Sequence, residues 1–371
     1  MNHVGRYFGV AIFLASLIAS SALAGGLYLY ELGNPEVGLA GAGWTARAQD
    51  AATVFTNPAG MTRLQKSELL FGSQPLYLHV DFSPDSKTTT TGKDGDASTW
   101  LPAGGVYYAH NLNPRLKIGA SAVGYFGLGL DYENDWVGRY YVQEVKLQAV
   151  GVQPAVAYRV TDWLSFGAGV VALYGVFDER AAVNNIGPNE GDGKLEIEDS
   201  DWTYQVNLGV LVEPREGTRF GLTFLTEGDL EFRDKPDFNN LGPALEALLR
   251  ANGLLDATIE VEFTMPRALT FSAYHELGDR LALMGNLGWQ DWSQFGKVGV
   301  SVSSEDTSNL TFDRNYKDTW HVAFGAQYRV APPWLLTAGF SYDSSMMDDE
   351  DRTPDLPLGE AWRFGLGARY D

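Results

Sequence analysis

The sequence predicts an all-β protein that forms a transmembrane antiparallel β-barrel. Three observations support this fold class: long segments that alternate bulky and small residues, connections that alternate between short and long, and an export signal that no long apolar run follows. Only helices and closed barrels satisfy every backbone polar group in lipid, so a membrane protein without spanning helices must be a barrel.

Residues 1–24 have the three parts of a secretory signal peptide. His3 and Arg6 give a weakly basic start, an apolar run extends from Phe8 to Leu23, and Ala22-Leu23-Ala24 fits a cleavage site. We predict removal after Ala24 and export from the cytoplasm, with a retained signal anchor as the alternative. Later runs fall short of the ~18 apolar residues that a spanning helix needs.

Residues 25–66 do not look like strands. In the stretch DAATVFTNPAGMTRL (50–64), a short helical turn reaches Phe55, Asn57-Pro58 stops it, and Gly60 releases the chain again. The segment is too apolar, and too able to fold compactly, to be an extended terminal tail. We therefore assign it as an N-terminal plug.

Residues 67–371 are predicted to form the barrel. In TWHVAFGAQYRV (319–330), Trp320, Phe324 and Tyr328 share one face, and Thr319 and Gln327 share the other. A soluble β-protein would also alternate, but with shorter strands. Here the bulky faces often begin and end with Trp or Tyr, as in the aromatic girdles of membrane barrels.

The connections alternate in length, which is typical of short periplasmic turns opposite long extracellular loops. Short turns lie at 111–115, 159–162, 213–218, 276–280 and 329–333, and long links lie at about 82–98, 131–140, 178–194, 229–257, 303–315 and 343–360. The predicted strands number twelve and begin near residues 67, 99, 115, 141, 163, 194, 218, 257, 280, 312, 334 and 360.

Composition argues against several function classes. With 27 Lys and Arg against 47 Asp and Glu, the formal charge of −20 disfavours nucleic acid. The absence of Cys removes disulfides and thiolate chemistry, and the five scattered His form no metal-ligand motif. No G-x-S-x-G motif occurs either, so we expect no enzyme, no metal and no cofactor.

Glycines gather in the third predicted strand, at Gly124, Gly127 and Gly129. Glycine inside a strand marks a bulge or a close approach of another segment. Other glycine pairs, such as Gly167 with Gly169, lack the following helix of a phosphate-binding loop. They fit small residues of the lumenal face beside a plug.

The long link 229–257 contains a predicted amphipathic helix that begins at Pro243 and ends at Asn252-Gly253. Its leucines, Leu245, Leu248 and Leu249, recur at helical spacing. Two interpretations stay open: the leucines pack on neighbouring loops, or they form a landing site for an apolar ligand.

The chain resembles the FadL/TodX-type outer-membrane transporters of long-chain fatty acids and aromatic hydrocarbons. The resemblance lies in GLAGAGWTARAQDAATVFTNPAGMTRL (38–64), DWVGRYY (135–141), WQDWSQF (289–295), NYKDTWHVAFGAQYR (315–329) and the segment AGFSYDSS to RTPDLPLGEAWRFGLGARY at the end. These motifs extend from residue 38 to the end of the chain in the family's order.

The resemblance implies a barrel of fourteen strands with an N-terminal hatch in the lumen. Twelve strands are counted here, and the family's last hairpin is the part without a counterpart. Asn57-Pro58-Ala59 would be the hatch signature, and a kink at Gly124 to Gly129 would open the wall. The resemblance also implies an outer-membrane location in a Gram-negative bacterium, a monomer, and contact with lipid and lipopolysaccharide.

From these motifs we predict passive uptake of hydrophobic molecules, with long-chain fatty acids first and aromatic hydrocarbons as the alternative. Leucines 245, 248 and 249 would capture the ligand, residues Phe55 to Ala59 would gate it, and Gly124 to Gly129 would release it into lipid. Arg139 could pair with a ligand carboxylate or contact lipopolysaccharide, and Arg267, Lys317 and Arg363 are further candidate cations. A general porin and a purely structural barrel are alternatives of another class.

Overall fold

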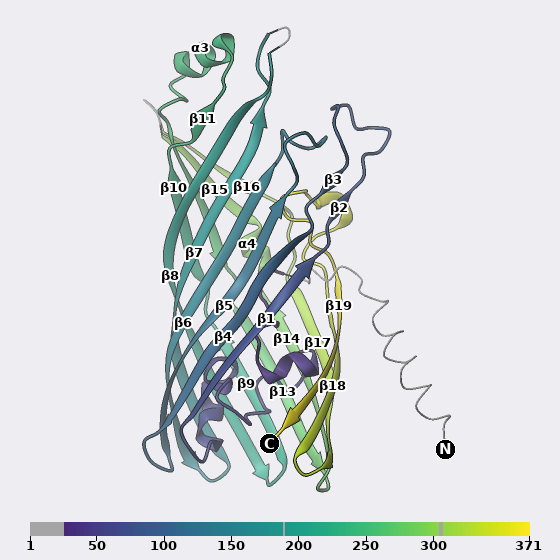
Figure 1. Cartoon of the computed structure of the whole chain (residues 1–371). Coiled ribbons are helices and arrows are strands. Elements are labelled where there is room, and N and C mark those ends of the chain that lie inside the picture. The colour runs from purple at the N-terminus through teal and green to yellow at the C-terminus, as the bar shows by residue number, and fades with distance from the viewer. Residues whose placement is uncertain (1–25, 188–189, 304–306) are drawn as a thin grey trace, which may run out of the picture.

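A computed structural model describes residues 26–187, 190–303 and 307–371 of the chain, so the predicted signal peptide lies outside the described residues. Twelve strands follow one another in an antiparallel sheet that curls into a barrel, in the order β1-β4-β5-β6-β7-β8-β9-β13-β14-β17-β18-β19, and the short strand β11 pairs with β8 beside this path (Figure 1). Their bounds are β1 Glu68–Leu78, β4 Thr99–Asn111, β5 Leu116–Asp131, β6 Glu144–Thr161, β7 Leu164–Val183, β8 Gly193–Arg215, β9 Thr218–Leu225, β13 Ala268–Leu277, β14 Leu281–Gln290, β17 Thr319–Ala331, β18 Trp334–Asp343 and β19 Ala361–Tyr370. The twelve predicted strands and their antiparallel order are confirmed.

A second sheet extends the wall upward, in the order β10-β12-β15-β16. Its strands are β10 Gly228–Asp234, β12 Thr258–Met265, β15 Lys297–Ser303 and β16 Thr307–Asp313. Sequence periodicity did not predict the breaks that separate these strands from the main sheet. One break falls at Pro266, which lacks the N–H that a ladder bond needs.

The remaining elements are short. They are the strands β2 Asp81–Phe82, β3 Gly95–Asp96 and β11 Asp237–Asn239, the helices α2 Thr53–Thr56, α3 Pro243–Ala251 and α4 Trp292–Phe295, and the 3₁₀ helices η1 Pro35–Leu39, η2 Pro58–Arg63 and η3 Asp349–Asp351. The helix predicted from Pro243 is confirmed as α3. Among the described residues, no helix has the length and apolar character needed to cross a membrane.

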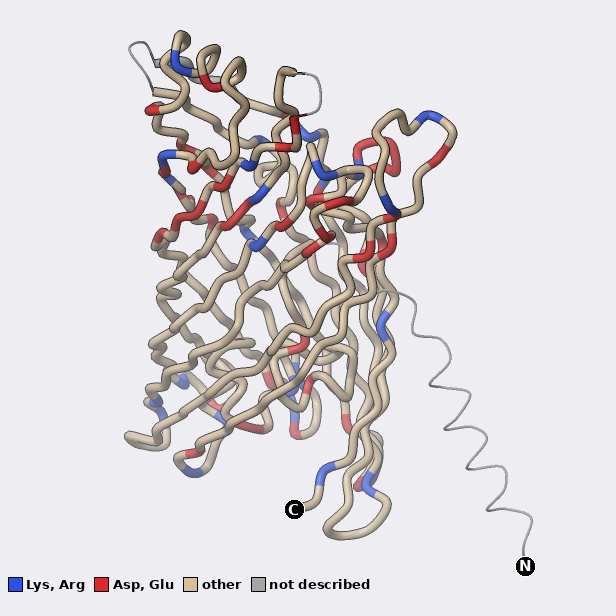
Figure 2. The backbone as a smooth tube through the Cα atoms, turned by 45° about the horizontal axis from the view of Figure 1, so that its top comes forward, with Lys and Arg blue, Asp and Glu red and all other residues tan. Residues whose placement is uncertain are grey.

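The two faces of the barrel wall have the predicted polarity. Trp320, Phe324 and Tyr328 of β17 are exposed on the outside, whereas His321 and Gln327 are buried inside. Charged residues gather at the upper loops and at the lower turns, and the middle of the wall carries few (Figure 2). A lipid-facing apolar band between two polar rims follows from this distribution.

Residues 26–66, called here the N-terminal segment, lie inside the barrel in its lower half (Figure 1). The main chain at Pro58-Ala59 touches Gly167 of β7 so closely that a Cβ there would clash, and Val37 approaches Gly365 of β19 in the same way. Small inward-facing residues therefore make room for the segment.

Buried polar groups attach the N-terminal segment to the wall. Asn286 of β14 accepts a hydrogen bond from the Gly43 N–H at 2.9 Å, and Ser272 of β13 accepts one from the Thr45 N–H at 3.0 Å. The guanidinium of Arg219 donates to the carbonyls of Ala46 and Arg47, both at 3.0 Å. These bonds satisfy backbone groups that would otherwise be buried without partners.

Candidate ligand-binding and release site

A cavity of about 540 Å³, called here the upper cavity, lies in the lumen toward the long loops. Its volume is in the range of small-molecule sites. Its walls are mainly aliphatic and aromatic side chains from six strands and α4, namely Leu128, Val145, Leu147, Phe177, Ile197, Val261, Phe263, Phe295, Val298 and Val300. Burial of an apolar chain is the interaction that such walls offer.

One end of the upper cavity is polar. Arg314, in the connection between β16 and β17, donates from Nη1 to Oδ2 of Asp355 at 2.7 Å. Burial by itself would lower the pKa of Arg314, but the neighbouring carboxylate of Asp355 outweighs it and raises that pKa, so the guanidinium stays charged. Tyr141, Glu179 and Thr353 line the same end. We call this group the polar end of the upper cavity.

A row of aromatic rings leads from the upper cavity down to the N-terminal segment. Phe295 is 5.2 Å from Trp292 between ring centroids, and Trp292 is 5.2 Å from Tyr28. Tyr28 then contacts Tyr125 of β5 at 5.5 Å, and Tyr125 contacts Phe55 at 5.4 Å. Three of these four pairs are edge-to-face and the pair of Tyr28 with Trp292 is tilted, and together the rings make a continuous aromatic path.

The lower rings of this row surround a small inner pocket of about 80 Å³. Phe55, one of the predicted gating residues, lines this pocket beside Trp44 and Tyr125. The structure therefore places Phe55 on the apolar path, with the rings of Tyr125, Tyr28 and Trp292 between it and Phe295 of the upper cavity.

A third cavity, of about 310 Å³, lies at an irregularity of β5 and is called here the wall cavity. The β5–β6 ladder shifts register between Gly124 and Phe126. Gly124 and Gly127 line the wall cavity, and a Cβ added at either would meet no atom within 4 Å. Gly129 lies just above, where an added Cβ would touch Gln148. The glycine cluster thus coincides with the irregular strand that the sequence predicted.

The N-terminal segment connects the inner pocket with the wall cavity. Tyr28 forms an antiparallel bridge with Phe126, and the Leu29 N–H donates to the Tyr125 carbonyl at 3.3 Å. Leu29 lines both cavities. A movement of residues 28–29 would therefore change the passage between them.

Asn57, Pro58 and Ala59 lie away from the upper cavity, against β7 and β8. The Asn57 side-chain amide donates to the carbonyls of Thr45 at 2.7 Å and Val210 at 3.1 Å, and its oxygen accepts from the Ala59 N–H at 3.1 Å. Asn57 is completely buried. The geometry of this motif is that of an anchor holding the N-terminal segment to the wall.

Arg139 lies in the long loop after β5 and binds other loops. Its Nε donates to Asp192 Oδ2 at 2.7 Å, its Nη1 donates to the Thr91 carbonyl at 2.6 Å, and the guanidinium lies 4.5 Å from the Tyr140 ring centroid. Burial alone would raise the pKa of Asp192, but hydrogen bonds from Tyr140 and Arg139 outweigh it and lower that pKa. Arg139 joins three loop segments and does not line the upper cavity.

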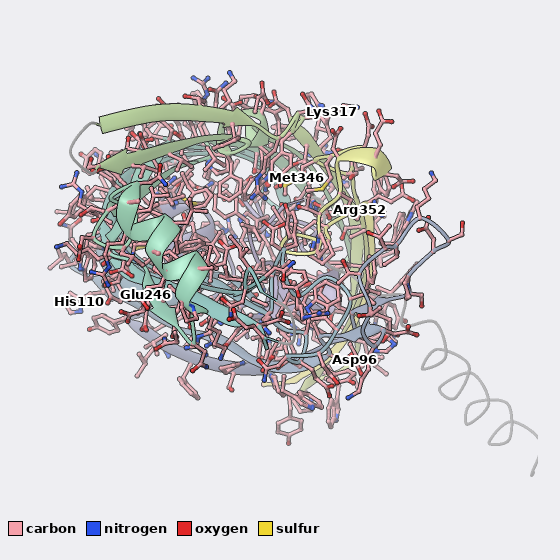
Figure 3. All side chains as sticks on the ribbon, turned by 90° about the horizontal axis from the view of Figure 1, so that it is seen from above. Asp96, His110, Glu246, Lys317, Met346 and Arg352 are labelled. Carbon is pink, nitrogen blue, oxygen red and sulfur yellow. The ribbon has the colours of Figure 1, made fainter. Side chains whose placement is uncertain are left out.

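The leucines of α3 stand above the barrel. Leu245 is buried, Leu249 is half-buried and Leu248 is exposed. Seen from above, α3 with Glu246 lies on one side of the opening, and Met346 lies toward the other side (Figure 3). The structure thus divides the leucines: Leu245 packs against neighbouring residues, and Leu248 is exposed above the barrel.

The three other candidate cations are engaged elsewhere. Arg267 pairs with Asp291 at 2.6 Å, and Lys317 pairs with Asp348 at 2.5 Å near the surface. Arg363 of β19 points into the lumen, where it binds Asp343 and donates to Glu31 of the N-terminal segment at 2.9 Å. None of the three lines the upper cavity, whose described lining contains Arg314 instead.

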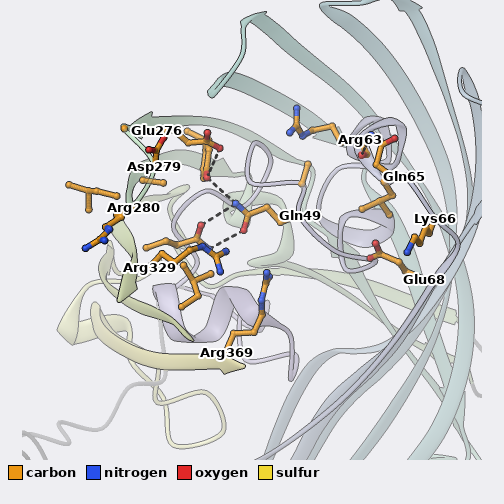
Figure 4. A pocket seen from close by; sticks show the side chains of 18 residues that line it. Gln49, Arg63, Gln65, Lys66, Glu68, Glu276, Asp279, Arg280, Arg329 and Arg369 are labelled. Atoms are coloured by element: carbon orange, nitrogen blue, oxygen red, sulfur yellow. Dashed lines mark hydrogen bonds between the residues drawn. The ribbon is translucent and has the colours of Figure 1, made fainter. Parts of the chain in front are cut away.

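Below the N-terminal segment, at the short-turn end, lies a polar cavity of about 560 Å³, called here the lower cavity (Figure 4). Gln49 spans it by donating to the Tyr274 hydroxyl at 2.9 Å and pairing with Gln327 at 3.1 Å. Its charged lining consists of Arg63, Lys66, Glu68, Glu276, Asp279, Arg280, Arg329 and Arg369. Such a surface favours water and ions over an apolar ligand.

Sequence reasoning missed Arg314, Glu179 and Tyr28. Arg314 and Asp355 are 41 residues apart along the chain and meet only through the fold. Glu179 falls in the long link predicted at 178–194, whereas in the structure β7 continues to Val183. Tyr28 lies just after the predicted cleavage site and shows no periodicity, so only its aromatic character could have drawn notice.

Comparison with known families gives one match along nearly the whole chain. The sequence model of the family described as outer membrane protein transport protein (OMPP1/FadL/TodX) matches residues 15–371. A long-chain fatty acid transport protein of Escherichia coli is 24% identical over 96% of this chain and 85% of its own length. Outer membrane protein P1 of Haemophilus influenzae is 26% identical over 95% of this chain and 84% of its own length.

Solved structures share the fold at low sequence identity. A FadL homologue from Pseudomonas aeruginosa superposes with a TM-score of 0.77 at 20% identity, and the match covers 93% of this chain and 87% of the other. The toluene transporter TodX of Pseudomonas putida gives a TM-score of 0.69 at 17% identity, covering 93% and 90%.

Proposed function

The chain belongs to the OMPP1/FadL/TodX family of outer membrane transport proteins, and on this premise we propose that it admits hydrophobic molecules passively through the outer membrane of a Gram-negative bacterium. The relatives named above are transport proteins, which fits a function without catalysis. We take the long-loop end of the barrel as extracellular and the short-turn end as periplasmic. A monomer that contacts outer-membrane lipid and lipopolysaccharide is our expectation for its state in the membrane.

One observation carries the proposal: an apolar upper cavity is joined through aromatic rings to a wall cavity at the irregular part of β5. The upper cavity binds the ligand, and the wall cavity is the place where the ligand leaves the barrel. Each CH₂ group buried in the upper cavity contributes about 0.8 kcal/mol, so a long alkyl chain is held strongly enough to leave water.

Release follows from a rearrangement of the N-terminal segment. Tyr28 and Leu29 lie between the inner pocket and the wall cavity. A ligand that binds better when these residues are displaced would shift the population toward that conformation. The ligand then passes beside Gly124 and Gly127 into the lipid around the barrel.

The lower cavity supports sideways release over a route straight through the lumen. Its lining includes Arg63, Lys66, Arg280, Arg329 and Arg369, and an apolar chain gains no solvation by entering it. The hydrogen bonds at Asn57 and Arg219 also fix the N-terminal segment across this route.

For the ligand we propose long-chain fatty acids, with aromatic hydrocarbons as the second candidate. The relatives' names support both classes: one is a long-chain fatty acid transport protein, and another is a toluene transporter. The aliphatic part of the upper cavity favours an extended chain. The row of rings from Phe295 to Phe55 is the observation that favours an aromatic ligand.

The test is growth and uptake by a deletion strain with and without a plasmid copy of the gene. We expect the plasmid to restore uptake of radiolabelled oleate, and we compare oleate with toluene-like carbon sources. The proposal would be overturned if the plasmid restored the uptake of neither fatty acids nor aromatic hydrocarbons. Single-channel recording of the purified protein separates a porin from this mechanism, because a porin gives large steady conductance steps in the absence of ligand.

A further inference from the structure

The wall cavity lies where two neighbouring strands stop pairing. The last pair of the β4–β5 ladder toward the long loops is Gly105 with Val123. Beyond this pair, among the described strands, β4 pairs only with β1, and β5 pairs only with β6. The wall therefore has a slit between β4 and β5. Leu101 of β4 and Gly127 of β5 line the wall cavity from the two sides of this slit.

The wall cavity extends from the lipid-facing surface of the barrel to the lumen. Val150 of β6 and Tyr174 of β7 line it from outside, where their exposed fractions are 53% and 36%. Leu29 of the N-terminal segment lines it from inside, and the Leu29 N–H donates to the carbonyl of Tyr125 on β5 at 3.3 Å. The N-terminal segment thus forms the inner end of the opening.

Aromatic side chains place the wall cavity close to the outer membrane–water interface. Trp100 directly precedes Leu101 on β4, and Trp202 of β8 is the ladder partner of Tyr174. Both indoles are exposed on the outside of the barrel. Exposed Trp and Tyr mark the height at which acyl chains meet the lipid headgroups. With the long loops on the extracellular side, the wall cavity opens to the acyl chains of the outer leaflet.

Water is a poor occupant of this opening. Apart from Gln148 and the Tyr174 hydroxyl, the side chains that line it are apolar, whereas a buried water needs two to four polar partners. An empty opening would leave its lining atoms without contacts on one side. An acyl chain supplies those contacts, and acyl chains surround the barrel at this height.

We infer that the wall cavity is a binding site for an acyl chain of a membrane lipid, which enters from the outer surface and reaches Leu29. The site itself does not depend on the proposed function. Its consequence rests on the sideways release proposed above, because a departing fatty acid has to take the place of the bound chain. The bound chain also keeps the slit closed to ions while no ligand is leaving.

Photocrosslinking from the acyl chain tests the site. The full chain is reconstituted in phosphatidylcholine nanodiscs that contain a small share of a phospholipid with a diazirine in the middle of one acyl chain. After illumination, the labelled residues are identified by mass spectrometry. We expect labelling of Leu29 and of the buried Phe126, and no labelling of Leu39, which is completely buried in the same N-terminal segment. Phe324, exposed on the outside of β17, reports the access of the lipid in every sample.

The variant that tests the cause is Gly127→Val. A Cβ at Gly127 meets no atom within 4 Å, and the valine side chain fills part of the wall cavity. We expect labelling of Leu29 to fall at least about tenfold and labelling of Phe324 to stay unchanged. Gly191→Val is the matched control, because it adds the same side chain in open space in a loop. If Gly127→Val does not fold, Gly124→Val replaces it, since Gly124 lines the same cavity and has the same room.

The outcomes separate this inference from the proposed function. Labelling of Phe324 without labelling of Leu29 and Phe126 overturns the lipid site and leaves sideways release intact. Equal labelling of Leu29 in wild type and in a folded Gly127→Val protein also overturns the site, because the acyl chain would then reach Leu29 by another route.

An excess of oleate tests the exchange. We expect oleate to displace the lipid and to lower the labelling of Leu29, with labelling of Phe324 unchanged. If oleate leaves the labelling of Leu29 as it is, while Gly127→Val still removes it, the lipid site stands and release of fatty acid through this opening is overturned.

Discussion

Tyr28 of the N-terminal segment pairs through its backbone with Phe126 of β5, at the residue where the β5–β6 ladder shifts register. The irregular strand is therefore held on its inner side by the segment that fills the lumen. Breaking this bridge would free the edge of the wall cavity and the floor of the inner pocket together. Ligand binding and wall opening can be coupled through one pair of residues.

A cross-link across this pair tests whether the N-terminal segment has to move. Directly opposed antiparallel residues have Cα atoms about 4.5–5.5 Å apart, which suits a disulfide, and the chain contains no other Cys. We expect the variant Tyr28→Cys with Phe126→Cys to bind oleate when oxidised but to pass none into liposome lipid, and to recover on reduction. The two single variants are the controls. Equal transport by the oxidised and reduced forms would show that this bridge stays closed during transport.

The wall cavity provides a test of sideways release. A Cβ added at Gly127 meets no atom within 4 Å, so we expect Gly127→Val to fold normally while filling part of the wall cavity beside β5. We expect uptake of labelled ligand to fall at least about tenfold, with little change in binding to the upper cavity, because only the exit is blocked. Gly191→Val is the matched control, since it adds the same side chain in open space in a loop. Normal uptake by a folded Gly127→Val protein would rule out this exit.

The alternation of side chains was enough to predict the barrel, because residues such as Trp320 and His321 must face lipid and lumen in turn. The glycine cluster predicted the irregular part of β5 for a similar local reason, since strands seldom tolerate three glycines in six residues without a bulge. The helix α3 was predicted from its Pro start and its leucine spacing. Each of these signals lies within one element.

The upper cavity could not be predicted in the same way, because it is built from contacts between distant residues. Arg314 meets Asp355 only when two loops close over the lumen, and Trp292 reaches Tyr28 only through the filled barrel. Asn57 was expected to be part of a gate because of the resemblance to the transporter family. Two of the three hydrogen bonds that hold its turn in place join residues that are far apart in the sequence, so no local pattern could have predicted them.

Loss of the Asn57 side chain should loosen the N-terminal segment. Asn57→Ala removes the partners of the Thr45 and Val210 carbonyls and of the Ala59 N–H, at roughly 1–3 kcal/mol for each buried group left unpaired. We expect faster hydrogen exchange in residues 45–63 and a measurable ion conductance where wild type has little. Asn252→Ala, in the exposed end of α3, is the control and should change neither. Unchanged exchange in Asn57→Ala would mean that the other contacts suffice to hold the segment.

The exposed leucine of α3 should affect the rate of capture more than its strength. Leu248 is 50% exposed and lies above the barrel, so a ligand would contact it before entering. We expect Leu248→Ser to slow the association of oleate about threefold to tenfold and to leave its equilibrium affinity for the upper cavity nearly unchanged, as measured by stopped-flow fluorescence. Leu112→Ser is the matched control, because Leu112 is 49% exposed in a short turn at the opposite end. Equal slowing in both variants would remove α3 from the capture step.

The contact between Arg139 and Asp192 should make the upper loops sensitive to acid. The pKa of Asp192 is lowered in the folded protein, because the hydrogen bonds from Tyr140 and Arg139 outweigh the effect of burial. Its stabilising effect is therefore complete above the usual Asp pKa of about 3.9 and is lost as pH falls through the lower folded value. We expect hydrogen exchange of residues 131–142, corrected for its intrinsic pH dependence, to be slow at pH 7 and pH 5 and faster near pH 2.5.

Asp192→Asn should bring the low-pH behaviour of these loops to pH 7, since the amide cannot form the ion pair with Arg139. The matched control is Asp162→Asn in a short turn at the other end, which should leave exchange of residues 131–142 as in wild type. Loops that stay protected in Asp192→Asn would show that the bond from Arg139 to the Thr91 carbonyl and its stacking on Tyr140 hold the three loop segments without the ion pair. Arg139→Ala would then be required to release them.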